Sequence, residues 1–245
     1  MKDFHITAEI SLFCDHIEFK EPFEIKPNCD QIKKIELKSH PEKIVVDYLV
    51  TSELEREAKE LADFHLNFLA DRLAFKENIP IKEVKIISIV CTGKEGENLS
   101  ICVSEYVNLQ DSVVVKKIIG KKSIEQISDF IQKNNVTGEI QEYFMMYKEA
   151  ISERSIGLRF YQLYRLLEKI NGNNRRSADE YISRNCPGVE TRMSGKNNNE
   201  RVTIFTWIRD SIHPKARQIG FPYAEISKNV HKLQDLVKKE IEYKL

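Results

Sequence analysis

The spacing of the apolar residues changes about half way along this chain, and that change limits the folds open to it. In FHITAEISLF, residues 4–13, apolar and polar side chains alternate strictly from Phe4 to Leu12, which is the pattern of a half-buried β-strand. From Ser123 onward the apolar residues recur instead at the spacing of an amphipathic helix. The sequence therefore predicts an α+β protein in which strands precede helices.

The first part, residues 1–121, is expected to form a mostly antiparallel sheet with one long helix. Further β-rich runs, bounded by prolines and polar turn residues, occur at 32–38, 44–50, 84–91, 100–106 and 112–118. Between them, apolar residues at helical spacing run from Ser52 to about Lys76. Ser52 and Glu55 match the S-x-x-E capping box, so the helix is expected to begin at Ser52. His65 lies in the apolar stripe and is interpreted as a core histidine.

The second part, residues 122–245, is expected to be an all-α bundle. The segment 154–170, RSIGLRFYQLYRLLEKI, is apolar over a wide arc, as in a helix buried between neighbours. Residues 186–200 are rich in glycine and asparagine and predict a loop. Helix is expected to resume at about Glu200 and to end before Pro214, and a last helix is expected from Tyr223 onward.

Charge is distributed unevenly although the formal net charge is zero. Residues 1–136 contain 19 Lys and Arg against 24 Asp and Glu, and the remaining residues contain 19 against 14. Most of the arginines also lie in this second, basic part. Arginine binds phosphate through a bidentate fork, so the asymmetry favours a phosphate-bearing partner. An ordinary solvated surface explains the charge equally well.

Several classes of protein are disfavoured by composition. No apolar run approaches the roughly 18–20 residues of a membrane-spanning helix, and the first residues lack a secretory signal pattern. Five cysteines, scattered and without a C-x-x-C pair, argue against a disulfide framework and against a structural zinc site. We therefore expect a cytoplasmic protein that has no membrane association, no metal and no cofactor.

The segment TWIRDSIHPKAR carries the strongest candidate site. Arg209 and His213 stand four residues apart, a spacing that places both on one side of a helix. Histidine accepts and donates protons near neutral pH, and arginine can hold a phosphoryl group while negative charge develops on it. Asp210 could orient Arg209 or a water molecule. The spacing alone also fits a chance pair or a helix cap, and both interpretations stay open.

These residues resemble the motif of the HEPN family, helical domains of prokaryotic defence and toxin systems. The family pattern is an arginine, usually followed by Asn, Asp or His, and then a histidine near a helix end. The upstream RFYQLYRLLEKI resembles the family's apolar helix ending in Leu-Glu, which implicates Glu168 as a supporting residue. Tyr164 falls near Glu168 and could line a cleft beside it, although an aromatic residue on a buried helix also fits a packing role. FLADRLAFKENIPIKEVKII is similar, more loosely, to a segment of the sheet domains that precede some such bundles.

The resemblance implies a metal-independent endoribonuclease that cleaves RNA through attack of the 2′-hydroxyl. Arg209, His213 and Asp210 would be the catalytic residues, and Lys215 and Arg217 would bind RNA. The protein would act as a homodimer through its helical bundle, in a toxin or phage-defence setting that could include an antitoxin or other defence partner.

The motif departs from the family pattern in one respect. HEPN members usually place four to six residues between the arginine and the histidine, whereas Arg209 and His213 are separated by three. Some HEPN-like sequences read R-(N/D)-S-I-H-H-P, and here Pro214 follows His213 directly. The alternative function is therefore a catalytically degenerate HEPN-like binding or scaffold protein, whose sheet domain recognises a partner or ligand.

Overall fold

The structure is a computed structural model that divides into two compact units, Met1–Asn135 and Val136–Leu245. The described residues are 1–13, 16–19, 21–27, 29–40, 42–92, 116–119, 121–132, 137–194, 200–212 and 222–245. The division expected after residue 121 differs from this one by helix α2 (Lys121–Gln132), which packs against α1 (Glu55–Glu77) within the first unit. The segregation of a sheet and helices into an α+β fold is confirmed.

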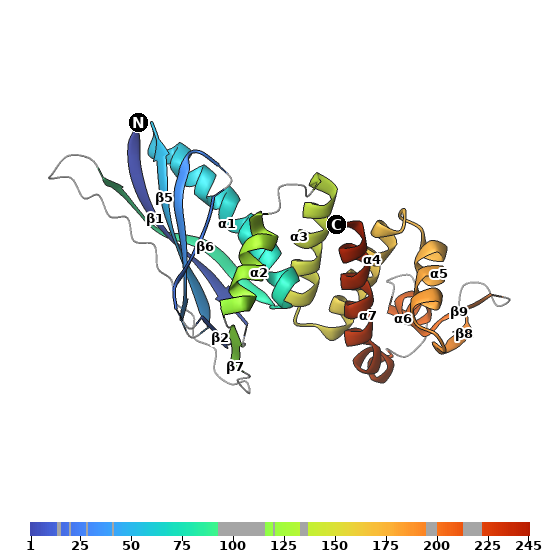
Figure 1. Ribbon diagram of the computed structural model, residues 1–245. Coiled ribbons are helices and arrows are strands. Elements are labelled where there is room, and N and C mark those ends of the chain that lie inside the picture. The colour runs from blue at the N-terminus through green and yellow to red at the C-terminus, as the bar shows by residue number, and fades with distance from the viewer. Residues whose placement is uncertain are drawn as a thin grey trace. The chain divides into compact units, whose positions relative to one another are not determined.

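The first unit is built on a five-stranded antiparallel sheet in the order β3-β4-β5-β1-β6. Its strands are β1 (Lys2–Leu12), β3 (Phe23–Ile25), β4 (Ile32–His40), β5 (Lys43–Ser52) and β6 (Ile81–Thr92). A separate parallel pair joins β2 (His16–Phe19) to β7 (Lys116–Ile119). The strict alternation in β1 and β5 buries every second side chain, and α1 lies along one face of the sheet (Figure 1). The predicted sheet with one long helix is therefore present. The run predicted at 100–106 and the first part of the run at 112–118 lie outside the described residues.

Helix α1 begins at Glu55, three residues after the expected start at Ser52, so the predicted capping box was wrong. Its N-cap is Leu54, whose side chain makes no capping hydrogen bond. Ser52 is the last residue of β5, and its Oγ donates to Glu57 Oε2 at 2.9 Å. Strand pairing of Ser52 with Lys2 thus prevails over the local helix signal.

Arg72 fixes α2 to α1 from inside the first unit. Only 1% of this residue is exposed. Its guanidinium lies 4.0 Å from the centroid of the Phe68 ring, and Nη1 donates to the backbone carbonyls of Phe130 and Ile131 near the end of α2. Burial lowers the pKa of Arg72 to about 10. A charged group is therefore used here to close a helix end in the interior.

The second unit is a helical bundle with α4 at its centre. Its described helices are α3 (Gly138–Ser152), α4 (Ile156–Ile170), α5 (Arg175–Asn185), α6 (Ile204–Ile212) and α7 (Tyr223–Lys244). Helix α4 packs against all four others, as its wide apolar arc predicts. None of the helices in the described ranges is long and apolar enough to cross a membrane.

A short β-hairpin interrupts the helical unit where a loop was expected. Strand β8 (Thr191–Met193) pairs in antiparallel fashion with β9 (Arg201–Thr203), and Ser194 N donates to Glu200 O at 2.8 Å. The helix expected from about Glu200 consequently starts at Ile204. Strands of three residues carry too little alternation to be recognised from sequence.

His65 makes the stability of the first unit depend on pH. Burial, followed by the positive charge of Arg72, lowers its pKa from 6.5 to about 4. The unfolded chain therefore binds more protons than the folded chain between these values. The stabilisation by neutral His65 is complete above about pH 6.5 and is lost as the pH falls towards 4.

Protonation of His65 in the unfolded chain should lower the unfolding free energy of wild type by about 2 kcal/mol between pH 7 and pH 5. We therefore expect the unfolding free energy of His65→Leu to fall by about 2 kcal/mol less than that of wild type over the same interval. Urea unfolding of the full chain at both pH values, followed by circular dichroism, measures this difference. His40→Leu, at an exposed histidine in β4, is the control and should retain the wild-type pH dependence. An unchanged pH dependence in His65→Leu would contradict the prediction.

Candidate functional site

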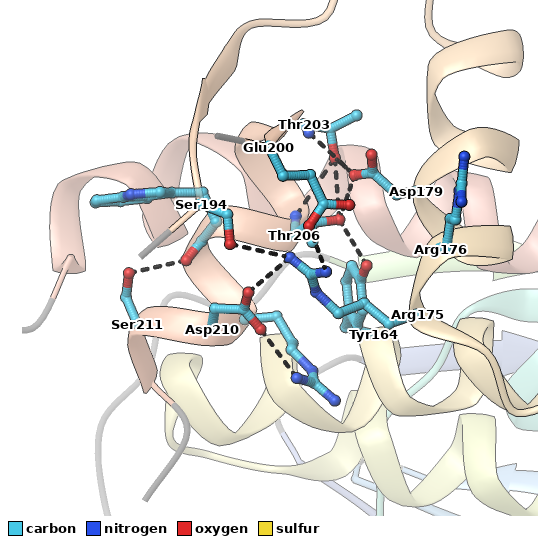
Figure 2. Close-up of polar contacts among 12 residues, drawn as sticks. Tyr164, Arg175, Arg176, Asp179, Ser194, Glu200, Thr203, Thr206, Asp210 and Ser211 are labelled. Atoms are coloured by element: carbon cyan, nitrogen blue, oxygen red, sulfur yellow. Dashed lines mark hydrogen bonds and ion pairs between the residues drawn. The ribbon is translucent and has the colours of Figure 1, made fainter. Parts of the chain in front are cut away.

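A buried polar cluster sets the start and direction of α6. Asp179 on α5 accepts hydrogen bonds at Oδ1 from Thr203 N at 3.0 Å, from Thr203 Oγ1 at 2.7 Å and from the hydroxyl of Thr206. Thr206 Oγ1 also lies 2.6 Å from the hydroxyl of Tyr164 on α4 (Figure 2). A carboxylate at a helix N-terminus satisfies free N–H groups and complements the helix dipole. This cluster therefore ties α6 to α4 and α5.

Arg209 follows on α6 and lies between two buried carboxylates. Its Nη2 is 2.9 Å from Glu168 Oε1, and its Nη1 donates to Asp210 Oδ1 at 2.9 Å. Only 9% of Arg209 is exposed. Burial by itself would lower the pKa of Arg209, but Glu168 and Asp210 outweigh it and raise that pKa above its ordinary value. The guanidinium is thus held charged and in one orientation.

Asp210 connects Arg209 to a second arginine. Arg175 Nη2 is 2.9 Å from Asp210 Oδ2, and the same residue reaches Glu200 Oε2 and Ser194 Oγ in the hairpin, each at 3.4 Å (Figure 2). We call the chain of residues Glu168, Arg209, Asp210, Arg175 and Glu200 the arginine network. It links α4, α5, α6 and the hairpin through alternating charges.

A pocket of about 450 Å³ opens beside the arginine network. It is lined by four basic side chains, one carboxylate and two uncharged residues: Arg165, Lys169, Arg175, Arg209, Glu168, Met146 and Asn173. We call it the basic pocket. Its excess of positive side chains suits an anionic ligand, and arginine in particular suits phosphoryl oxygens.

The structure brings together three of the residues selected from sequence. Tyr164 lies next to them, and the other three selected residues are not described. Arg209, Asp210 and Glu168 are in contact. Tyr164 lies behind them, fully buried, with its ring centroid 6.0 Å from Arg209 Cζ, and burial raises the pKa of its hydroxyl. His213, Lys215 and Arg217 lie outside the described residues.

Metal binding by the described part of the chain has no obvious donor set. No group of three or more His, Cys, Asp or Glu side chains within it is arranged to hold a metal ion.

Arg175 was missed in the sequence analysis, although the sequence carries a signal for it. Arg175 and Arg176 are the first two residues of α5, where the helix dipole disfavours positive charge. Such a placement indicates carboxylate partners or a ligand. Arg165 and Lys169, which flank Glu168 on α4, were missed because their role becomes visible only when α5 and α6 close the pocket.

Asp179→Ala should lower the free energy of unfolding by about 1–3 kcal/mol, because it leaves buried donors of Thr203 and Thr206 without their acceptor. Urea unfolding followed by the fluorescence of Trp207, the single tryptophan of the chain and a residue of α6, measures the loss. Glu180→Ala is the matched control, since this neighbour pairs only at the surface with Arg176. Equal effects of the two substitutions would contradict the role of Asp179.

Three kinds of known protein were compared with the chain: family models, curated proteins and solved structures. No family model, curated protein or solved structure matches the chain. Function is therefore inferred from the residues of the site.

Proposed function

We propose that the protein is a metal-independent endoribonuclease of the HEPN type, acting in a prokaryotic toxin or phage-defence system. The observation that carries the proposal is Arg209, a charged guanidinium fixed between Glu168 and Asp210 at the wall of the basic pocket. A cation held in one orientation before substrate arrives stabilises developing negative charge without reorganisation. Phosphoryl transfer is a reaction in which such charge develops.

The reaction uses the RNA's own 2′-hydroxyl as nucleophile. The 2′-oxygen loses its proton as it attacks the adjacent phosphorus, and the bond from phosphorus to the 5′-oxygen breaks. His213 serves as general base or acid in this exchange. The leaving oxygen takes up a proton, so the products carry a 2′,3′-cyclic phosphate and a 5′-hydroxyl. Arg209 stabilises the charge on the non-bridging oxygens.

The surrounding residues have supporting roles in this proposal. Asp210 and Glu168 orient Arg209, and Tyr164 packs behind the guanidinium. Lys215 and Arg217 would bind RNA. Two protomers would pair through their helical units and present two such sites to one RNA.

A second candidate function is a HEPN-like binding or scaffold protein without catalysis. It is favoured by the burial of Arg209, whose two Nη atoms are both already engaged by carboxylates. In that case the charges of the arginine network hold the bundle together, and the sheet unit recognises the partner or ligand.

Arg209→Ala should reduce the rate of RNA cleavage by about 10²–10³, and His213→Ala by about 10²–10⁴. The measurement is cleavage of labelled single-stranded RNA by the full chain in the presence of a chelator. Arg176→Ala and His231→Ala are matched controls at exposed positions of the same unit, and both should cleave like wild type.

Each result has a defined meaning for the two candidates. Full cleavage by folded Arg209→Ala and His213→Ala would contradict the proposed active site. A wild-type protein that binds RNA but leaves it intact would favour the scaffold. Sedimentation of the wild type tests the dimer separately.

A further inference from the structure

The basic side chains of the pocket have two kinds of carboxylate partner. Glu168 and Asp210 are buried, with side chains 9% and 5% exposed. Glu200, which pairs with Arg175, and Glu142, which pairs with Lys169, are 39% and 44% exposed. The buried carboxylates are fixed parts of the fold. The exposed ones lie where a dissolved anion can compete with them.

The contact of Arg175 with its buried partner is shorter than the contact with its exposed partner. Its Nη2 lies 2.9 Å from Asp210 but its Nη1 lies 3.4 Å from Glu200, and charge-assisted hydrogen bonds of this kind normally measure about 2.7–2.9 Å. Asp210 therefore anchors the guanidinium, and Glu200 holds it loosely. Loss of Glu200 would leave Arg175 in place with donors free.

Two of the three guanidinium groups that line the pocket have a buried N–H group without an acceptor. The Nε atoms of Arg175 and Arg209 are buried and have no hydrogen-bond partner within the described part of the chain. Buried donors are normally satisfied. An anion that displaces Glu200 from Arg175 would offer that guanidinium a further acceptor.

The N-terminus of α5 is not itself the anion site. Asn174 Oδ1 already accepts hydrogen bonds from the backbone N–H groups of Arg176 and Ser177. The attraction for an anion must therefore come from the side chains of Arg175, Lys169 and Arg209, which line one pocket.

We propose that Arg175 and Lys169 form, beside Arg209, a binding site for a phosphoryl group, and that Glu200 occupies Arg175 until this group displaces it. The pocket volume, about 450 Å³, lies in the range of small-molecule sites, roughly 300–1,000 Å³, and leaves room for more than one phosphate. The inference rests on the proposed function in that the phosphoryl group belongs to RNA. A free phosphorylated molecule has the same chemistry and is distinguished below.

Displacement of Glu200 is coupled to the hairpin that carries it. Glu200 pairs through its backbone with Ser194, and Arg192 of β8 covers the ring of Trp207 with its Cζ 4.4 Å from the ring centroid. Release of Glu200 should therefore alter the surroundings of Trp207. Its fluorescence reports on the event without any requirement for cleavage.

The test is calorimetric titration of the full chain at constant ionic strength with two probes. One is inorganic phosphate, and the other is a single-stranded 2′-O-methyl oligonucleotide, which cannot be cleaved because it lacks the nucleophile. We expect Arg175→Gln and Lys169→Gln to weaken binding by about tenfold each, the loss of one charge-assisted contact. Glu200→Gln should strengthen binding severalfold and change the Trp207 emission of the unliganded protein.

Matched controls are available next to each changed residue. Arg176→Gln and Glu180→Gln alter an exposed ion pair of the same helix, and Arg176 points away from Asp210 (Figure 2). Both should bind like wild type. Thermal unfolding shows whether Arg175→Gln is folded, and the gain in affinity of Glu200→Gln cannot arise from misfolding.

The two probes separate the sources of the phosphoryl group. The predicted pattern with the oligonucleotide supports an RNA ligand, and the same pattern with phosphate alone supports a small phosphorylated ligand. The proposal is overturned if neither probe binds, or if the Arg175 and Glu200 variants behave like their controls. The binding site does not depend on cleavage, so it would still stand if the wild type bound the probes but did not cleave RNA. If the wild type cleaves RNA and Arg175→Gln cleaves and binds equally well, the nuclease proposal stands and the binding site is contradicted.

Discussion

The buried carboxylate of Asp210 is the interaction on which the interior of the helical unit depends. Each of its oxygens accepts from a different arginine, Arg209 on its own helix and Arg175 on α5. Two guanidinium groups so close together repel one another unless a negative charge lies between them. Removing one member of such a buried set leaves an uncompensated charge, which typically costs about 3–5 kcal/mol. The carboxylate therefore makes the basic pocket compatible with a folded bundle.

The two units solve the problem of a buried arginine in different ways. Arg72 lies against the Phe68 ring and donates to backbone carbonyls, and burial lowers its pKa. Arg209 lies between carboxylates, and its pKa is raised. The first arrangement closes a helix end, whereas the second keeps a full positive charge at the wall of a pocket. Only the second is suited to bind an anion.

The parts of the fold that depend on hydrophobic period could be predicted from the sequence. Alternation in β1 and the apolar arc of α4 identify the sheet and the central helix, because each pattern reports which side of an element is buried. Local signals were less reliable. Ser52 reads as a helix cap, but its pairing with Lys2 extends β5 instead. The hairpin of β8 and β9 is held by the contact of Thr203 with Asp179 on α5 and by the contact of Arg192 with Trp207 on α6, and neither contact is visible in the three-residue strands themselves.

The candidate site was predictable to the extent that its members share a helix or a family pattern. Arg209 and Asp210 are adjacent, and Glu168 follows from the resemblance of α4. Arg175 is 34 residues before Arg209 in the printed sequence, and nothing local joins them. The signal for Arg175 in the sequence is its position at the N-terminus of α5, where the helix dipole disfavours a positive charge.

The arrangement of fixed and displaceable carboxylates bears on how a phosphoryl group would reach Arg209. Glu168 and Asp210 cannot be replaced without dismantling the network, so an anion must approach the guanidinium from the side that the pocket leaves open. Arg175 and Lys169 line that side, and their partners Glu200 and Glu142 are exposed. In the proposed binding, an anion would exchange surface ion pairs, which are weak, for contacts with cations that the buried carboxylates hold in position. This difference would allow a bundle stabilised by its own salt bridges to bind a charged ligand as well.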